Sequence, residues 1–571
     1  MTSGLRKGLT SYGDPGFSLF LRKVLIKAMG YSDQALDRPI VGITNTASDF
    51  NPCHGNVPAL IESVKRGVML AGALPMVFPT ISLGEPFCHP TAMFLRNLMA
   101  MDTEEMIRAQ PMDAVVVIGG CDKTLPAQVM AAASVNLSAV VLPAGPMVAG
   151  HHRGEVVGAC TDCRRFWAEH RAGGIDAGEI DQISSRLAPS IGTCGVMGTA
   201  STMACLMEAL GLSLPMSASA PANGADRLRI AEATGTRAAQ LAVSGTPKPC
   251  DLITEASVRN AMVVLQAIGG STNGLIHLIA IAGRAGVPID LKAFDQLGRS
   301  VPVLLNLKPS GVHYMEHFHY AGGMPALLCQ LTPHLDLTAP VIGGGTLGDV
   351  IAQAEEIPDQ EVIRPLASPL SGQGAMAILY GNLAPDSAVI KQSAASPQLM
   401  KHTGRAVVFD SIEDLTRRID SPDLDVRADD VLVLRNAGPK GAPGMPEAGY
   451  LPIPVTLARQ GVRDMVRISD ARMSGTAFGT VVLHIAPEAA VGGPLAIIRT
   501  GDQISLDVEA RQLTLLIDAA EIESRLAAWK ALRPMRQKPP RGYAKLFEDS
   551  VLQANEGCDF DFLRGNGVPS K

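Results

Sequence analysis

Aromatic residues and basic clusters are scarce in this 571-residue chain. Phe, Trp and Tyr make up 4% of it, so a surface that stacks bases or sugars on aromatic rings is not expected. Lys and Arg number 49 against 55 Asp and Glu, and no dense Lys/Arg run offers a basic field to a polyanion. We therefore expect no nucleic acid among the partners.

Long apolar segments are also lacking. The first twenty residues contain no apolar core followed by a small-residue cleavage site, so they predict no secretory signal. Residues 124–150 carry no charge, but Pro126, Asn136, Pro143 and Pro146 divide them into short pieces, which predicts buried core instead of a membrane span. We expect a cytoplasmic protein with no membrane partner, in which the ten cysteines stay reduced.

Several catalytic signatures are missing as well. The chain contains no Walker loop with glycine directly before the lysine, and no GxSxG, which disfavours nucleotide hydrolysis and α/β-hydrolase chemistry. Cys160 and Cys163 form a CxxC pair that suits a redox pair or half of a zinc site, but no second CxxC completes a four-thiolate site. We favour a structural role for this pair and expect it to be dispensable for cluster binding.

What the chain does contain, from residue 39 onward, is an alternation of strand-like and helix-like segments. In the first predicted helix, Val57, Leu60, Val64 and Val68 fall on one apolar stripe. Such alternation predicts a parallel sheet covered by helices on both faces. The expected strands are 39–44, 76–82, 113–120 and 139–145, and the expected helices are 56–72, 91–110 and 125–136.

The last third of the chain is patterned differently. Residues 504–508 and 513–517 alternate apolar and polar side chains across a short turn, which predicts a β-hairpin. A stretch rich in Ser, Gly and Pro, residues 368–377, precedes this region and places a boundary near 375. We predict an α/β fold class with two domains, a parallel-sheet α/β domain over 1–375 and a β-rich domain over 376–571.

Three cysteines, Cys53, Cys121 and Cys194, lie in loops directly before predicted helices. In a parallel sheet such loops gather ligands at the carboxyl ends of strands, beside helix N-termini that lower a thiol pKa. Any one of these cysteines alone is more often a small buried packing residue. Together, three thiolates can hold an iron–sulfur cluster and leave one iron open as a Lewis acid.

Oxygen ligands for a hard cation are present too. Glu85, Asp122 and Glu447 lie in Gly- and Pro-rich turns, where carboxylates suit Mg²⁺. Lys123 would repel a metal as an ammonium, so it is either carbamylated after its pKa falls, or an ion-pair partner of Asp122. Ser474 precedes a glycine in a turn and is either a turn residue or a base that needs nearby positive charge to act as an alkoxide.

Seven motifs follow one another between about residue 40 and residue 497. They are "PCHGN", "GGCDKT", "GTCGVMGTASTM", "AIGGSTNGLIHLIAIAG", "GNLAPDSAVIK", "GPKGAPGMPE" and "RISDARMSGTAFGTVVLH". In this order they resemble the iron–sulfur-dependent dihydroxy-acid and sugar-acid dehydratase family, over nearly the whole chain. The resemblance implies an α/β domain followed by a β-barrel-like domain.

The resemblance also implies a reaction and a first cofactor. The enzyme would be a hydro-lyase that removes water from a 2,3-dihydroxy carboxylate to give a 2-keto-3-deoxy acid. Cys53, Cys121 and Cys194 would hold a [2Fe–2S] cluster, with [4Fe–4S] as the alternative. Its open iron would take the C3 hydroxyl as leaving group.

A second metal is implied in the same way. Glu85, Asp122, carbamylated Lys123 and Glu447 would surround Mg²⁺, which binds the substrate carboxylate and the C2 hydroxyl. Ser474 would take the C2 proton. Family members are dimers or tetramers with active sites near the subunit interface, so a homodimer or homotetramer is expected.

The substrate class follows from the same resemblance. Residues 97–113, 198–204 and 466–496 resemble the sugar-acid branch, which acts on arabinonate, xylonate or gluconate, more than the branched-chain amino-acid branch. Residues 158–173 depart from the arabinonate-type pattern. The alternatives are a dihydroxy-acid dehydratase of branched-chain amino-acid biosynthesis and, further away, a CxxC-based redox or zinc protein or a non-catalytic scaffold.

Overall fold

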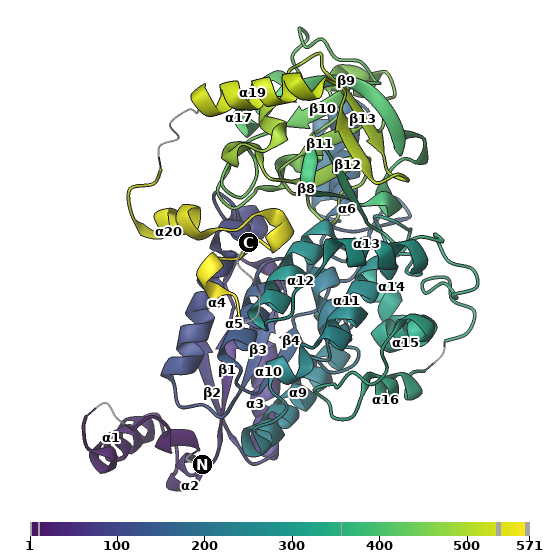
Figure 1. Cartoon of the computed structure of the whole chain (residues 1–571). Coiled ribbons are helices and arrows are strands. Elements are labelled where there is room, and N and C mark those ends of the chain that lie inside the picture. Colours follow the sequence, from purple (N-terminus) through teal and green to yellow (C-terminus); the bar gives the residue numbers. More distant parts are fainter. Residues whose placement is uncertain (1–2, 10–11, 356, 533–537, 566–571) are drawn as a thin grey trace.

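A parallel sheet wrapped in helices and a closed β-barrel form the two parts of the fold, one above the other in Figure 1. The computed structural model describes residues 3–9, 12–355, 357–532 and 538–565. The parallel-sheet domain comes first in the chain and the barrel second, so the predicted fold class, with its barrel-like second part, is confirmed.

The sheet has four parallel strands in the order β2-β1-β3-β4. Its β-branched residues, such as Val41, Val115 and Val117, are fully buried, because helices cover both faces. The alternation predicted from the sequence is confirmed, with the second strand beginning two residues earlier than expected. The strands are β1 (Ile40–Asn45), β2 (Leu74–Pro79), β3 (Ala114–Gly119) and β4 (Ala139–Pro143).

Two helix pairs cover the sheet. Helix α3 (Val57–Leu70) packs on α9 (Ala225–Ser244), and α4 (Ala92–Ala109) packs on α5 (Thr124–Val135). The chain passes from β1 outward to β2 and then back across to β3, so right-handed crossovers place the two pairs on opposite faces. The reversal between the neighbouring strands β1 and β3 creates the edge at which α/β sheets bind ligands.

A further group of helices lies beside α5. Helices α8 (Thr199–Ala209) and α12 (Thr272–Arg284) pack against α5, and α11 (Glu255–Ala267) packs against α8. Nearly every side chain of α8 and α12 is buried, so both helices lie in the interior of the domain. The N-termini of α8 and α12 meet, since the Oγ1 atom of Thr199 lies 2.8 Å from the Oγ atom of Ser271.

Eight strands close the barrel in the order β10-β11-β12-β8-β7-β14-β13-β9. The first, β7, begins at Ala377, beside the predicted boundary near 375. The predicted hairpin is confirmed, because β13 and β14 pair antiparallel with Ile504 opposite Leu515. The strands are β7 (Ala377–Gly381), β8 (Ala384–Ile390), β9 (Lys401–Phe409), β10 (Val431–Leu434), β11 (Arg467–Ser469), β12 (Val481–Ala486), β13 (Gln503–Asp507) and β14 (Gln512–Leu515).

The end of the chain leaves the barrel after α19 (Ala519–Leu532) and returns to the first domain. Helix α20 (Gly542–Ser550) packs Phe547 against Phe94 of α4, with ring centroids 4.8 Å apart. The Asp559 carboxylate pairs with the buried guanidinium of Arg284 on α12. The C-terminal segment therefore ties the two parts of the fold together.

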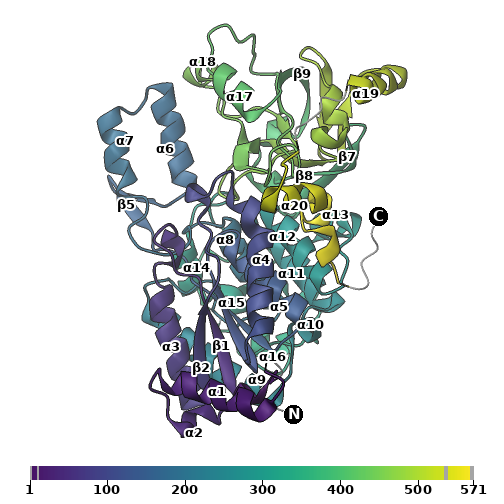
Figure 2. The same cartoon turned by 90° about the vertical axis from the view of Figure 1, so that its left-hand side faces the viewer.

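Two smaller units project from the body. One holds the strands β5 (Gly150–His152) and β6 (Glu155–Val157) with α6 (Thr161–Ala172) and α7 (Ala177–Ser184), as Figure 2 shows. The other is α1 (Pro15–Lys27), which stands out in Figure 1. None of the helices in the described part of the chain is both long and apolar enough to cross a membrane. Shorter helices are α2 (Asp33–Leu36), α10 (Pro249–Leu252), α13 (Leu291–Ser300), α14 (Met315–Tyr320), α15 (Gly323–Leu331), α16 (Leu347–Ala352), α17 (Ile412–Arg418) and α18 (Val455–Arg459).

The contact between α3 and α9 depends on glycine and gives a first prediction. A Cβ atom at Gly235 would lie 2.1 Å from the backbone oxygen of Val64. Gly235→Ala should therefore lower the free energy of unfolding by about 1–3 kcal/mol, the usual effect of overpacking. Gly283→Ala in α12 is the matched control, because a Cβ there meets nothing within 4 Å and alanine favours helix. Denaturant unfolding checks this, and equal stability of the two variants would contradict it.

Candidate active site

The predicted site residues meet where the sheet reverses its strand order. Cys53 follows β1, and Cys121, Asp122 and Lys123 follow the neighbouring strand β3, directly before α5. Glu85 follows β2 in a short 3₁₀ turn. Loops after parallel strands share one edge of a sheet, which is why residues distant in the sequence come together here.

A group of thiols lies on one side of this edge. Cys53 and Cys121 share a hydrogen bond, and Cys53 and Cys194 are close enough to interact electrostatically. The Sγ atom of Cys160 lies 3.3 Å from the Sγ atom of Cys194. The structure therefore unites the three predicted cysteines with a fourth, Cys160, which sequence reasoning kept apart from them. Cys163 packs instead into an apolar cluster beside α6.

His54 and Gly120, each next to one of these cysteines, allow the loops after β1 and β3 to lie close together. The Nε2 atom of His54 accepts hydrogen bonds from the backbone of Gly120 and Cys121, at 2.8 and 3.1 Å, and its Nδ1 atom lies 2.8 Å from the backbone oxygen of Thr46. Burial lowers the pKa of His54 to about 4, so the ring is neutral and can accept these bonds. A Cβ at Gly120 would lie 3.2 Å from the Cys53 oxygen and 3.1 Å from Thr193. Both residues were missed, although each adjoins a predicted ligand.

The expectation that these loops lower the thiol pKa values is wrong for Cys53 and Cys194. A hydrogen bond to Cys121, followed by burial, raises the pKa of Cys53 well above its ordinary value. A hydrogen bond to Cys160, again followed by burial, raises the pKa of Cys194. Neighbouring thiolates repel one another in a buried group, so these sulfurs ionise together only when cations balance them.

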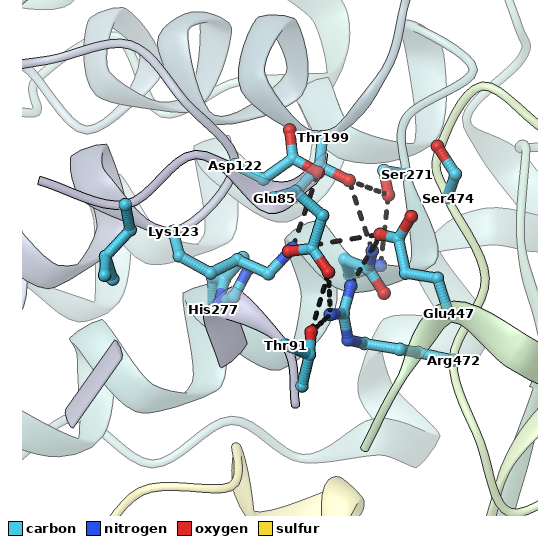
Figure 3. Close-up of polar contacts among 12 residues, drawn as sticks. Glu85, Thr91, Asp122, Lys123, Thr199, Ser271, His277, Glu447, Arg472 and Ser474 are labelled. Atoms are coloured by element: carbon cyan, nitrogen blue, oxygen red, sulfur yellow. Dashed lines mark hydrogen bonds and ion pairs between the residues drawn. The ribbon is translucent and has the colours of Figure 1, made fainter. Parts of the chain in front are cut away.

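A second group at this edge consists of charged side chains gathered around Lys123 (Figure 3). The Lys123 ammonium lies 3.1 Å from Glu85, 3.4 Å from Asp122 and 3.8 Å from Glu447. The interpretation of Lys123 as a partner of Asp122 is thus too narrow, since Glu85 is nearer. Glu447 belongs to the barrel domain, so both domains supply this group.

Arg472 was missed by sequence reasoning and joins the same carboxylates. One of its nitrogens lies 2.5 Å from Glu447, and another donates to Glu85 at 2.8 Å and to the Thr91 hydroxyl at 2.7 Å. The side chain is 1% exposed. A signal existed, because Arg472 stands two residues before Ser474 in the same motif, "RISDARMSGTAFGTVVLH".

The buried charges shift one another's pKa values. Burial alone would raise the pKa of Glu85, but the cations of Arg472 and Lys123 hold it well below its usual range. Burial dominates at Glu447 and raises its pKa. For Lys123, burial acts to lower the pKa, but the surrounding carboxylates raise it, so the amine is protonated here and not in the neutral form that carbamylation requires.

Ser474 lies on the loop between β11 and β12, beside Glu447 in Figure 3. Its Oγ atom lies 2.8 Å from the Oγ1 atom of Thr476. The loop reaches the α12 N-terminus because Gly475 lacks a side chain, and a Cβ there would lie 2.5 Å from Ser271. The Nζ atom of Lys391 donates to the Gly475 oxygen at 3.4 Å, and burial lowers the pKa of this lysine to about 7.

The donor atoms fit two kinds of metal group. Thiols from Cys53, Cys121 and Cys194 suit iron, and carboxylates suit Mg²⁺. Among the described residues, no hydrogen-bond partner is found for the buried Oδ1 atom of Asn273, and the buried Oε2 atom of Glu85 has only the Lys123 ammonium, 3.1 Å away, so both oxygens are open to a cation. Within that part of the chain no group of three or more His, Cys, Asp or Glu side chains is arranged to hold a single metal ion.

Comparison with known proteins covers most of the chain. Residues 38–350 match the model of the dihydroxy-acid/6-phosphogluconate dehydratase N-terminal domain. Residues 361–558 match the model of the corresponding C-terminal domain. The two matches together include both parts of the fold and every predicted site residue.

Full-length relatives agree with the family models. An L-arabonate dehydratase of Azospirillum brasilense is 48% identical over 96% of this chain and 96% of its own length. A 6-deoxy-6-sulfo-D-gluconate dehydratase of Pseudomonas putida is 46% identical over 94% of this chain and 93% of its own. A dihydroxy-acid dehydratase of Moorella thermoacetica is 38% identical over 94% and 96%. This chain therefore belongs to the dihydroxy-acid/6-phosphogluconate dehydratase family and is a dehydratase, an enzyme of the hydro-lyase class.

Proposed function

We propose that this dehydratase acts on a sugar acid such as arabinonate, xylonate or gluconate and forms the 2-keto-3-deoxy acid. The observation that carries the proposal is that several cysteine thiols, several carboxylates and the Ser474 loop lie together at one edge of the sheet. These residues come from both domains. A 2,3-dihydroxy carboxylate offers the matching chemistry, because it has a leaving hydroxyl, an acidic C2 hydrogen and two oxygen donors.

The thiol side would hold an iron–sulfur cluster. Cys53, Cys121 and Cys194 would be its ligands, as [2Fe–2S] or alternatively [4Fe–4S]. A cluster with one open iron supplies Lewis-acid assistance to the departure of the C3 hydroxyl. His54 would keep two of the ligand loops in register through its bonds to Gly120 and Cys121.

The carboxylate side would hold Mg²⁺ through Glu85, Asp122, Glu447 and carbamylated Lys123. Bound Mg²⁺ supplies positive charge next to the substrate carboxylate and C2 hydroxyl. Carbamylation requires the neutral amine, and the carboxylates oppose it by raising the pKa of Lys123. A divalent cation on the same carboxylates would offset this effect, so we propose that metal binding and carbamylation depend on each other.

The residues of the chain itself would perform the proton transfer. Ser474 would take the C2 proton, and the Lys391 amine, which donates to the neighbouring Gly475 oxygen, would in its protonated form favour a negative charge on the loop. The N-termini of α8 and α12, at Thr199 and Thr272, lie beside this loop and favour an anionic substrate.

The sugar-acid branch is supported by the pattern of identities. The arabonate and sulfogluconate dehydratases are 48% and 46% identical to this chain, against 38% for the dihydroxy-acid dehydratase. The runner-up is therefore a dihydroxy-acid dehydratase of branched-chain amino-acid biosynthesis.

We further propose a cytoplasmic homodimer or homotetramer with a small hydroxy acid as its ligand. Helix α1 exposes Phe20 and Leu25, each 62% accessible, and Met29 just beyond it is 72% accessible. Adjacent exposed apolar side chains of this size are typical of surfaces that associate. A second copy of the chain is the simplest partner for them.

A turnover screen tests the substrate class. Protein reconstituted anaerobically with iron, sulfide and Mg²⁺ should dehydrate one or more aldonates of five or six carbons faster than dihydroxyisovalerate. The 2-keto product is measured by mass spectrometry. Turnover of dihydroxyisovalerate alone would favour the runner-up, and no turnover of any hydroxy acid would contradict the proposal.

Removal of one carboxylate tests the Mg²⁺ site. Glu447→Gln should raise the Mg²⁺ concentration for half-maximal activity by about tenfold or more, a loss typical even of changes behind the ligands. Iron content should stay unchanged, because Glu447 lies on the carboxylate side. The exposed Glu413→Gln on α17 is the control, and equal Mg²⁺ dependence in both variants would exclude Glu447 as a ligand.

Ser474→Ala tests the base. Alanine fits a turn of this kind, so folding, iron and Mg²⁺ binding should survive, while kcat falls by roughly 10²–10⁴-fold with little change in KM. Exchange of the substrate C2 hydrogen with deuterated solvent, where the parent shows it, should stop. Thr476→Val removes only the hydroxyl partner of Ser474 and should cost less. A Ser474→Ala enzyme with near-parental kcat would rule out this base.

A further inference from the structure

We propose that Cys160 is a fourth thiolate ligand of the iron–sulfur cluster and binds the same iron as Cys194. The inference rests on the proposed function, in which Cys53, Cys121 and Cys194 hold the cluster. It assigns a metal-binding role to half of the CxxC pair, which the sequence predicts to be structural.

The distance between the two sulfurs is the first argument. The Sγ atoms of Cys160 and Cys194 lie 3.3 Å apart. Two thiolates on one tetrahedral metal, with bonds of about 2.3 Å as at zinc, stand about 3.8 Å apart. A movement of about half an ångström thus brings this pair to the separation of two ligands on one iron.

The arrangement of the four thiols is the second argument. Cys53 and Cys121 form one hydrogen-bonded pair, and Cys160 and Cys194 form the other. The pairs face each other closely enough for Cys53 to act electrostatically on Cys194. Two pairs of thiolates, one pair to each iron, complete the four-cysteine ligand set of a [2Fe–2S] cluster.

Buried contacts hold Cys160 in this place. Asp162 lies two residues after Cys160, and its side chain is 2% exposed. Its carboxylate accepts a hydrogen bond of 2.7 Å from the Tyr314 hydroxyl and lies 3.0 Å from the Lys308 ammonium. Thr161 donates a hydrogen bond of 3.0 Å to the backbone oxygen of Thr476. The start of α6 is therefore fixed to the Ser474 loop, so the backbone of Cys160 stays in place and only rotation of its side chain can take the sulfur away from Cys194.

Cys163 provides a contrast within the same motif. It lies three residues along α6, and its side chain packs with Val157, Phe166 and Ile183 in an apolar cluster. Within the described residues, Cys163 forms a hydrogen bond with Cys160 but none with Cys53, Cys121 or Cys194. The two cysteines of the CxxC pair therefore have different surroundings, and only Cys160 faces the cluster.

Four thiolates leave no open iron, so Cys160 has to leave before the substrate hydroxyl can take its position. The iron–sulfur bond breaks with both electrons remaining on sulfur, and the thiolate then takes up a proton from solvent. No oxidant or reductant is required. In the resting enzyme the cysteine would cover the iron on which the dehydration depends.

Alkylation mapping and spectroscopy test the assignment. Parent, Cys160→Ala and the matched control Cys163→Ala are reconstituted anaerobically and analysed for iron and sulfide, for visible absorption and for iodoacetamide labelling by peptide mass spectrometry. In the parent, loading should abolish the labelling of Cys53, Cys121, Cys160 and Cys194 but leave that of Cys163. Cys160→Ala should keep its iron with a shifted absorption spectrum, and Cys163→Ala should match the parent.

Three results would overturn the inference. One is labelling of Cys160 in loaded protein while the other three cysteines are protected, and another is a Cys160→Ala spectrum that superimposes on the parent. A Cys160–Cys194 disulfide in the loaded, anaerobic parent is the third. The first two results leave the three-cysteine cluster of the proposed function intact, the disulfide would remove Cys194 from that ligand set as well, and a parent that binds no iron would refute both proposals.

Discussion

The active site depends on the ion pairs and hydrogen bonds that the buried guanidinium of Arg472 makes. It comes from the barrel domain and binds Glu85 and Thr91 of the α/β domain together with Glu447 of its own. A buried charge is tolerated only when it is paired, so removing either Arg472 or its carboxylate partners would leave an unpaired buried ion. The same residue stands two positions before Ser474, and its fixed position therefore places the serine loop at the edge of the sheet.

The serine loop also connects the thiol side and the carboxylate side of the site. Thr161, next to Cys160, donates to the Thr476 oxygen, and Gly475 allows the loop to touch Ser271 at the α12 N-terminus. A substrate that spans the thiol and carboxylate groups would therefore lie across this loop. One loop can thus present its hydroxyl to a substrate held from both sides, which is the geometry that the proposed elimination needs.

Much of the fold could be predicted from the sequence because its signals are local. The strand within 113–120 is buried on both faces and is therefore a continuous run of apolar, mostly β-branched residues. The hairpin at 504–517 is buried on one face and therefore alternates apolar and polar residues, so the sequence pattern reports how each strand is buried. The loops with Cys53, Cys121 and Cys194 could be singled out for the same reason, since each breaks such a pattern just before a helix. The helix after Cys194, α8, could be expected in the same way, whereas the burial of α8 and α12 on nearly all sides could not be inferred from local pattern.

The sequence by itself determined the fold class, the family and the loops that carry thiols and carboxylates, because these depend on local pattern and motif order. Only the tertiary structure decided which side chains meet. Lys123 is nearest to Glu85 and not to its neighbour Asp122, and Cys160 contacts Cys194 as well as Cys163 of its own motif. The physical reason is that crossovers and domain packing set such distances, and neither residue spacing nor periodicity contains them.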